Sequence, residues 1–203
     1  MSPFWLLLIC VGVASSIRIT KREQQLDSNQ TEENPIRSLA SSLAPIPGNF
    51  YMVRSKYGRY LDMRQESGDI HNVLSLSETY MNNNQWARDS FLVELIDNGD
   101  GYYMVKSKYG RYLDMRQESS GEALNVWSIS ESRMKNNLWA KDSFLVKLID
   151  DGDSYFWIKS KFGHYLDMRQ GEGNYFDALA LKENYMNKNL WARDSFVVQF
   201  VPV

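Results

Sequence analysis

The sequence predicts an all-β fold, a β-trefoil of three four-stranded repeats with twelve strands, and two observations support this prediction. The first is internal repetition. SKYGRYLDMRQES at 55–67 recurs unchanged at 107–119 and returns as SKFGHYLDMRQGE at 160–172. The second is that apolar and polar residues alternate in short stretches between turn residues, which is typical of half-buried strands.

The trefoil is predicted to occupy residues 50–203, with repeats at 50–101, 102–154 and 155–203. Six strands would form a barrel and six would cap it around a threefold axis. Closure of this kind protects the strand edges that three separate sheets would expose. A propeller is excluded because it needs at least about four blades of four strands each. The chain has only three repeats.

Within the first repeat, alternation predicts strands near 51–55, 60–64, 74–77 and 91–95. A short helical turn is expected at Tyr80–Asn84. Their apolar side chains would form one shared core, and one tryptophan per repeat is large enough to anchor it. These tryptophans are Trp86, Trp139 and Trp191.

The N-terminal segment differs from the repeats. Residues 1–16 contain an apolar run followed by small residues, which predicts a signal peptide too short to span a bilayer. Residues 17–49 are polar and Pro-containing, which predicts a flexible linker or propeptide. This segment contains Lys21-Arg22, a candidate cleavage point, and Asn29, the acceptor of a glycosylation sequon. We therefore expect a secreted, extracellular protein without a membrane span.

Composition excludes several functional classes. The formal net charge of −2 disfavours a nucleic-acid partner, because no large basic face is implied. The single cysteine, Cys10, lies in the predicted signal peptide, so no disulfide is expected in the trefoil. His71 and His164 occupy non-equivalent positions, and no cluster has metal-ligand spacing. We expect no metal, no cofactor and no catalytic nucleophile, and hence no enzyme.

Acidic turns at 97–100 and 150–153 contain oxygen ligands that calcium accepts. Turns rich in Asp and Gly are common without a metal, and we assign these to turn chemistry.

The second predicted strand keeps its polar residues in every repeat. At outward positions of the fourth strand, Glu94, Lys147 and Gln199 differ freely. At positions predicted to face outward on the second strand, three residues are identical in all three repeats. They are Tyr60, Asp62 and Arg64, then Tyr112, Asp114 and Arg116, then Tyr165, Asp167 and Arg169.

Two interpretations remain open at this point. The fixed residues either form a structural network, with Asp62 pairing to Arg64 or Arg88, or they form three equivalent ligand sites. A carboxylate that accepts and guanidinium and amide groups that donate hydrogen bonds suit a polyhydroxylated ligand.

The pattern Leu61-Asp62-Met63, Asn72-Val73-Leu74 and Asn84-Gln85-Trp86 resembles the repeat of the ricin-B-type (R-type) trefoil lectins. In that family a Gln-x-Trp motif closes each repeat and an early Asp binds the sugar. The resemblance covers Phe50 to Val203 and places the sugar-binding carboxylate on Asp62, Asp114 and Asp167. It places a polar partner on Asn83 and Asn136.

This chain departs from that pattern in three ways. The closing motif is Asn-x-Trp, with Asn84, Asn137 and Asn189, and the third repeat has Lys188 in place of the polar partner. The expected aromatic platform falls on Ser77, Ser130 and Lys182. Tyr60, Tyr112 and Tyr165, or Tyr175 in the third repeat, could replace it.

We therefore predict a secreted, multivalent lectin with up to three sites that binds glycans or glycoproteins. Asp62, Asp114 and Asp167 would accept hydrogen bonds, and Arg64, Arg116 and Arg169 with Asn83 and Asn136 would donate them. The alternative is a secreted trefoil that binds protein, as a signalling factor or protease inhibitor. It would act through one asymmetric loop, at 66–72, 118–125 or 171–177. The oligomeric state is left open.

Overall fold

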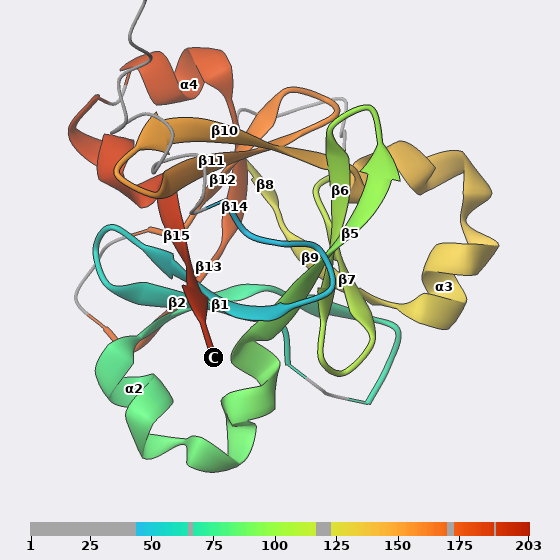
Figure 1. The fold of residues 1–203 in the computed structure, drawn as a ribbon, viewed down its shortest axis with the longest axis horizontal. Helices are drawn as coiled ribbons and strands as arrows, with labels where there is room; N and C mark the ends of the chain where they lie inside the picture. The colour runs from blue at the N-terminus through green and yellow to red at the C-terminus, as the bar shows by residue number, and fades with distance from the viewer. Residues whose placement is uncertain (1–43, 65–66, 117–122, 170–172, 189) are drawn as a thin grey trace, which may run out of the picture. The chain divides into compact units, whose positions relative to one another are not determined.

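A computed structural model of the chain describes residues 44–203, except 65–66, 117–122, 170–172 and 189; the side chains of 85–87, 138–140 and 190–192 are also outside the description. The predictions for the signal peptide, the linker, Lys21-Arg22 and Asn29 lie outside the described residues. In the described part, each repeat contributes five strands, a short α-helix and a 3-10 helix (Figure 1). No helix in these residues has the length and apolarity needed to cross a bilayer.

The first repeat contains β1 Phe50–Ser55, β2 Arg59–Asp62, β3 Ile70–Asn72, β4 Leu74–Ser77, α2 Glu78–Asn83, η2 Gln85–Phe91 and β5 Leu92–Gly99. The second contains β6 Tyr102–Ser107, β7 Arg111–Asp114, β8 Ala123–Asn125, β9 Trp127–Ser130, α3 Glu131–Asn136, η3 Leu138–Phe144 and β10 Val146–Gly152. The third contains β11 Tyr155–Ser160, β12 His164–Asp167, β13 Tyr175–Asp177, β14 Leu179–Lys182, α4 Glu183–Lys188, η4 Leu190–Ser195 and β15 Val197–Pro202.

Six of these strands form a closed antiparallel barrel. Each neighbour in the ring β1–β5–β6–β10–β11–β15 is hydrogen-bonded to the next, and β15 returns to β1. The barrel interior is the main hydrophobic core, with fully buried side chains such as Val53, Val93, Val146 and Ile158. Because every barrel edge is paired, no barrel strand presents an open edge.

The remaining nine described strands cap one end of the barrel, and they explain why twelve strands were predicted and fifteen are found. Each repeat contains one strand more than predicted: in the first repeat the predicted third strand at 74–77 is β4, and the short strand β3 before it was not expected. In the first repeat β4 pairs with β2 of its own repeat, whereas β3 pairs with β9 of the second repeat. The chain changes partner at Val73, which lies between them.

The three residues at this break bind one another through their backbones. Val73 donates to Val126, Val126 donates to Ala178, and Ala178 donates back to Val73, at N···O distances of 3.0, 3.3 and 2.8 Å. All three side chains are fully buried. The hydrogen-bond ring satisfies backbone groups that have no ladder partner at the threefold axis.

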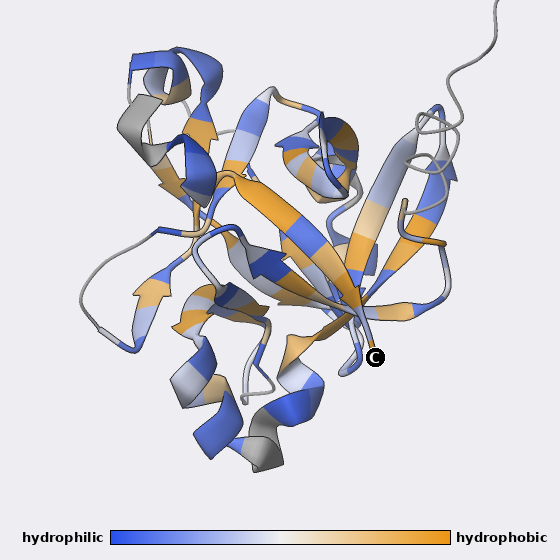
Figure 2. Cartoon of the chain, turned by 60° about the vertical axis from the view of Figure 1, so that its left-hand side comes forward, coloured by the Kyte–Doolittle hydropathy of each residue, from blue (hydrophilic) through white to orange (hydrophobic). Residues whose placement is uncertain are grey.

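Three smaller apolar clusters, one per repeat, lie between the cap strands and the helices. Their buried members are Tyr60, Leu76 and Phe91; Tyr112, Ile129 and Phe144; and Tyr165, Leu181, Met186 and Phe196. Figure 2 shows apolar residues along the central strands and hydrophilic residues over much of the helices. The helices therefore cover a face of the sheet that the sequence predicts to be exposed.

The predicted helical turn is found, and it begins two residues earlier than expected, at Glu78. The Ser77 hydroxyl caps it by accepting the Tyr80 N–H, and the Asn84 side chain closes it by donating to the Tyr80 carbonyl at 2.7 Å. Trp86, Trp139 and Trp191 lie in the 3-10 helices, and the prediction that they anchor the core falls on side chains outside the description.

Candidate functional site

The three repeated aspartates end the strands β2, β7 and β12, and their burial contradicts the predicted outward orientation. Asp62, Asp114 and Asp167 are 1%, 0% and 3% exposed. The reason is that a 3-10 segment from the end of the same repeat covers them. The N–H that follows each aspartate donates to a serine carbonyl of that segment: Met63 to Ser90, Met115 to Ser143 and Met168 to Ser195, each at 2.9 Å.

Each aspartate is paired with the arginine two residues later. The Nε–Oδ2 distance is 2.5 Å for Arg64 and Asp62, 2.5 Å for Arg116 and Asp114, and 3.2 Å for Arg169 and Asp167. The arginine side chains are 31%, 30% and 45% exposed. Each guanidinium thus forms the outer layer of a pair whose carboxylate is the inner layer.

The electrostatics of these pairs reflect burial. Burial raises the pKa of Asp114, and hydrogen bonds from Ser143 and Arg116, with the charge of Arg116, oppose the rise without cancelling it. Burial likewise raises the pKa of Asp167 against the opposing effects of Ser195 and Arg169. A buried carboxylate is costly unless it is paired and hydrogen-bonded, and the arginine meets both conditions at Oδ2 of each carboxylate.

The pKa of Arg64 is raised even though its burial acts to lower it. Burial disfavours the cation, but the hydrogen bond and charge of Asp62, with a smaller contribution from Tyr80, outweigh it and raise the pKa of Arg64. The guanidinium therefore stays charged, and the hydrogen bond to the buried Asp62 fixes its position.

The predicted asparagine partners are not joined to these pairs. Asn83 and Asn136 end the helices α2 and α3 and are exposed. In the described part of the chain, neither makes a hydrogen bond to the aspartate of its repeat. The third repeat has the exposed Lys188 at this place. The structure thus brings together the predicted aspartate and arginine of each repeat, but not the asparagines predicted for the first two repeats.

The prediction that the tyrosines of the second strands replace the aromatic platform is wrong. Tyr60, Tyr112 and Tyr165 are only 5–7% exposed because their rings pack in the clusters beneath the helices. Tyr175 is 62% exposed, yet β13 pairs it with Leu76 of the first repeat. It therefore extends the sheet of the first repeat.

Sequence reasoning missed three serines that support the site. Ser90, Ser143 and Ser195 are 2–3% exposed and lie against the aspartates. The signal that could have found them is the motif Asp-Ser-Phe, which recurs in each repeat at 89–91, 142–144 and 194–196.

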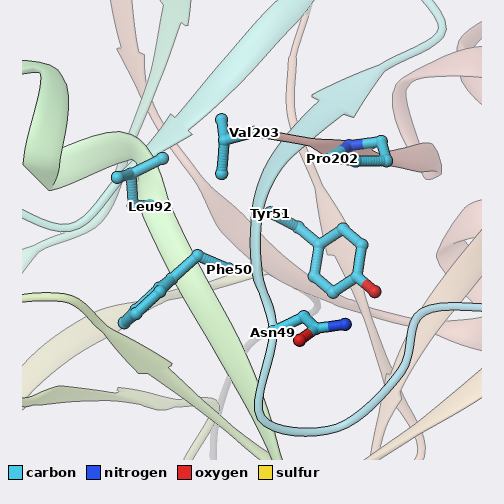
Figure 3. A pocket seen from close by; sticks show the side chains of 6 residues that line it. All are labelled: Asn49, Phe50, Tyr51, Leu92, Pro202 and Val203. Carbon is cyan, nitrogen blue, oxygen red and sulfur yellow. The ribbon is translucent and has the colours of Figure 1, made fainter.

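Two of the hollows formed by described residues have linings that include none of the three aspartates. One of about 440 Å³ lies between β1 and the helical segment, lined by Met52, Met81, Asn82 and Arg88. The other, of about 460 Å³, lies beside the chain end (Figure 3). It is lined by Asn49, Phe50, Tyr51, Leu92, Pro202 and Val203.

The acidic turns use their carboxylates locally. Asp97 accepts the N–H of Gly99 and Asp150 accepts the N–H of Gly152, each at 2.8 Å. Among the residues that the structure describes, no three His, Cys, Asp or Glu side chains are grouped so that they could hold a metal ion.

The sequence matches no protein-family model and no curated protein, whereas the fold is similar to solved structures. A designed threefold-symmetric protein, ThreeFoil, aligns with a TM-score of 0.59 and 21% identity over 76% of this chain and 99% of its own. The cytolethal distending toxin from Actinobacillus actinomycetemcomitans aligns at 0.56 with 10% identity, over 77% of this chain and 92% of its own.

An exo-β-1,3-galactanase from Clostridium thermocellum aligns at 0.55 with 18% identity, over 78% of this chain and 31% of its own. At these identities the likeness shows the fold alone. The chain has an all-β, threefold-repeated fold of the β-trefoil type.

Proposed function

We propose that the protein is a secreted carbohydrate-binding trefoil related in function to the R-type lectins, with up to three equivalent sites and no catalytic activity. The observation that carries the proposal is the threefold-repeated arginine, held in place by a buried carboxylate and partly exposed. Neighbouring outward positions such as Glu94, Lys147 and Gln199 vary, whereas this pair does not.

The geometry supports a ligand-facing role for the arginines. In each pair the aspartate engages Nε, so the terminal amino groups belong to the outer layer. A fixed guanidinium presents planar, directional donors that suit neighbouring hydroxyl oxygens of one sugar ring. Arg64, Arg116 and Arg169 would therefore be the primary donors, and Asn83 and Asn136 would contribute from the helix ends.

The aspartates take a different part from the one predicted. A carboxylate covered by its own arginine meets a ligand only if the guanidinium moves aside. We therefore propose that Asp62, Asp114 and Asp167 orient the arginines, because a pre-positioned donor loses less conformational freedom on binding.

We propose that each single site binds weakly and that three of them on one rigid body act together on clustered glycans. Multivalent engagement strengthens binding by about 10²–10⁴-fold without new contacts. This mechanism requires three comparable sites, and the occurrence of the same pair in all three repeats supports it.

The test is a glycan array with the triple variant Arg64→Lys, Arg116→Lys and Arg169→Lys. Lysine keeps the charge beside the buried aspartate but has no terminal fork, so the fold should persist while glycan binding falls at least about tenfold. Arg193→Lys, at an exposed pair with Asp151, is the matched control and should bind as the parent does.

Unchanged glycan binding in the triple variant would contradict the proposal. Loss of activity on exchange of one of the loops 66–72, 118–125 or 171–177, with the arginines intact, would favour the protein-binding alternative.

A further inference from the structure

One position on the barrel distinguishes the three repeats chemically. The first strand of each repeat begins with an aromatic residue that faces a different side chain on the adjacent barrel strand. Phe50 is registered with Glu94. Because Val146 is registered with Tyr103 and Val198 with Phe156, the corresponding antiparallel partners are Lys147 for Tyr102 and Gln199 for Tyr155. The facing residue is thus acidic beside the first repeat's aromatic residue, basic beside the second and neutral beside the third.

A hollow of about 310 Å³ lies at the basic position, beside Tyr102. Lys147 from β10 and Lys159 and Lys161 from the β11 hairpin line it, together with Gly163. The Nζ atoms of Lys147 and Lys161 lie 4.3 and 5.8 Å from the centre of the Tyr102 ring. This volume is at the lower end of small-ligand pockets, about 300–1,000 Å³, and suits one charged group with the sugar ring that carries it.

Two of the three lysines that line this hollow are paired with a carboxylate, and the third is not. Lys159 is 3.3 Å from Glu183, and Lys161 is 2.9 Å from Asp142. Lys147 makes no ion pair with any residue in the described part of the chain. The charge of Asp100, in addition to that of Asp142, acts on Lys161. The two existing pairs are exposed, and exposed pairs contribute only about 0–1 kcal/mol, so an incoming anion can replace them.

The equivalent positions in the other repeats are balanced. Beside Phe50, Lys106 pairs with Glu94 at 3.3 Å and Lys108 pairs with Asp89 at 3.0 Å. Beside Tyr155, Lys56 pairs with Asp194 at 3.3 Å and Arg54 lies 3.6 Å from Glu78. The second repeat alone among these three described positions has a third cation.

We infer that the hollow beside Tyr102 binds the sulfate or carboxylate group of an acidic saccharide, an inference that rests on the proposed carbohydrate function. The ammonium groups of Lys147 and Lys161, which both lie over the Tyr102 ring, would donate charge-assisted hydrogen bonds to an oxyanion. The chain carries a net charge of −2, so this is a local anion site and not part of a nucleic-acid surface.

The test compares a sulfated oligosaccharide with its desulfated form by titration calorimetry. The parent should bind the sulfated form about tenfold more tightly, the effect of one charge-assisted hydrogen bond. Lys147→Gln and Lys147→Glu, which copy the third and first repeats, should abolish that preference. Lys108→Gln, at the related position beside Phe50, should keep it. Glu94→Lys should add a second site.

An unchanged sulfate preference in Lys147→Gln would overturn the inference. So would inorganic sulfate that competes as strongly as the saccharide at matched ionic strength, or a phosphopeptide that binds more tightly. The triple arginine-to-lysine variant separates the two proposals: it should lose affinity for neutral glycans and keep the preference for the sulfated over the desulfated form. If it keeps neutral binding while Lys147→Gln loses the preference, only the proposed arginine sites fail.

Discussion

The contacts between repeats, which we call seams, differ at the first residue of the second strand, and this difference shows how the threefold sequence diverges. Arg59 and Arg111 begin the second strands of repeats one and two and are both 6% exposed. Each binds a buried serine through its hydroxyl and carbonyl, Ser75 or Ser128, at 2.9–3.1 Å. Each also reaches a glycine carbonyl in another repeat, Gly173 at 3.2 Å or Gly68 at 3.1 Å.

In the third repeat both partners of this interaction are changed. His164 stands in the arginine position and Ala180 in the serine position, and both are buried. Removing both partners of a buried hydrogen bond costs less than removing one. The replacement is not complete, because His164 Nδ1 is buried without a hydrogen-bond partner among the described residues. The comparison indicates that divergence at a buried polar seam proceeds by paired replacement.

The largest predicted effect breaks one intact seam. Arg111→Ala should lower the free energy of unfolding by about 3 kcal/mol, because the Ser128 hydroxyl and carbonyl and the Gly68 carbonyl lose their donor in a buried place. Chemical denaturation measures this loss. A change within about 0.5 kcal/mol would mean that the seam contributes little to stability.

A double variant sharpens the comparison by copying the third repeat into the second. Arg111→His together with Ser128→Ala should cost about 1 kcal/mol less than the sum of the two single changes, because the partners are coupled. A double-mutant cycle measures the coupling. Additive costs would show that the pairing of His164 with Ala180 has no energetic basis.

A smaller effect concerns the acid stability of the third seam. Burial, and secondarily the positive charge of Lys182, lower the pKa of His164 from its ordinary value of 6.5. The unfolded chain therefore binds the proton more readily, and stability should decrease as the pH falls through 6.5 towards the lowered value, by at most about 1.4 kcal/mol per pH unit. His164→Gln should flatten that slope, and an unchanged slope would remove this residue as its cause.

The smallest effect has the opposite sign and lies at lower pH. The pKa of Asp114 is raised above its ordinary value of 3.8, so the folded chain binds this proton more readily than the unfolded chain. Its contribution to stability should increase as the pH falls through the raised value towards 3.8. The difference in unfolding free energy between the parent and Asp114→Asn, measured across this window, should shift in favour of the parent on acidification; a shift in favour of the variant would contradict the assignment.

Repetition and alternation were sufficient to predict the all-β fold and a six-stranded barrel. They did not predict the additional short strand before Val73, because the change of hydrogen-bond partner at that residue leaves no mark on side-chain periodicity. The extra strands arise at the threefold axis, where backbone groups from three repeats meet.

For the site, the sequence places each aspartate on the same strand face as the arginine two residues later. It predicts that both face outward, whereas the aspartates are buried. Asp62 and Arg64 are two residues apart, so they share one face of the strand, and alternation predicts this. Their burial depends on the 3-10 segment Gln85–Phe91, which arrives from later in the repeat and covers that face. A single strand cannot reveal that a distant segment covers it.

The central claim is that three arginines, each fixed by a buried aspartate, contact the glycan. It is tested most directly by following the Nε–H resonances of Arg64, Arg116 and Arg169 by NMR while an oligosaccharide that binds is added. All three signals should shift along the same binding curve. Binding that leaves these signals in place and moves those of another surface would contradict the account.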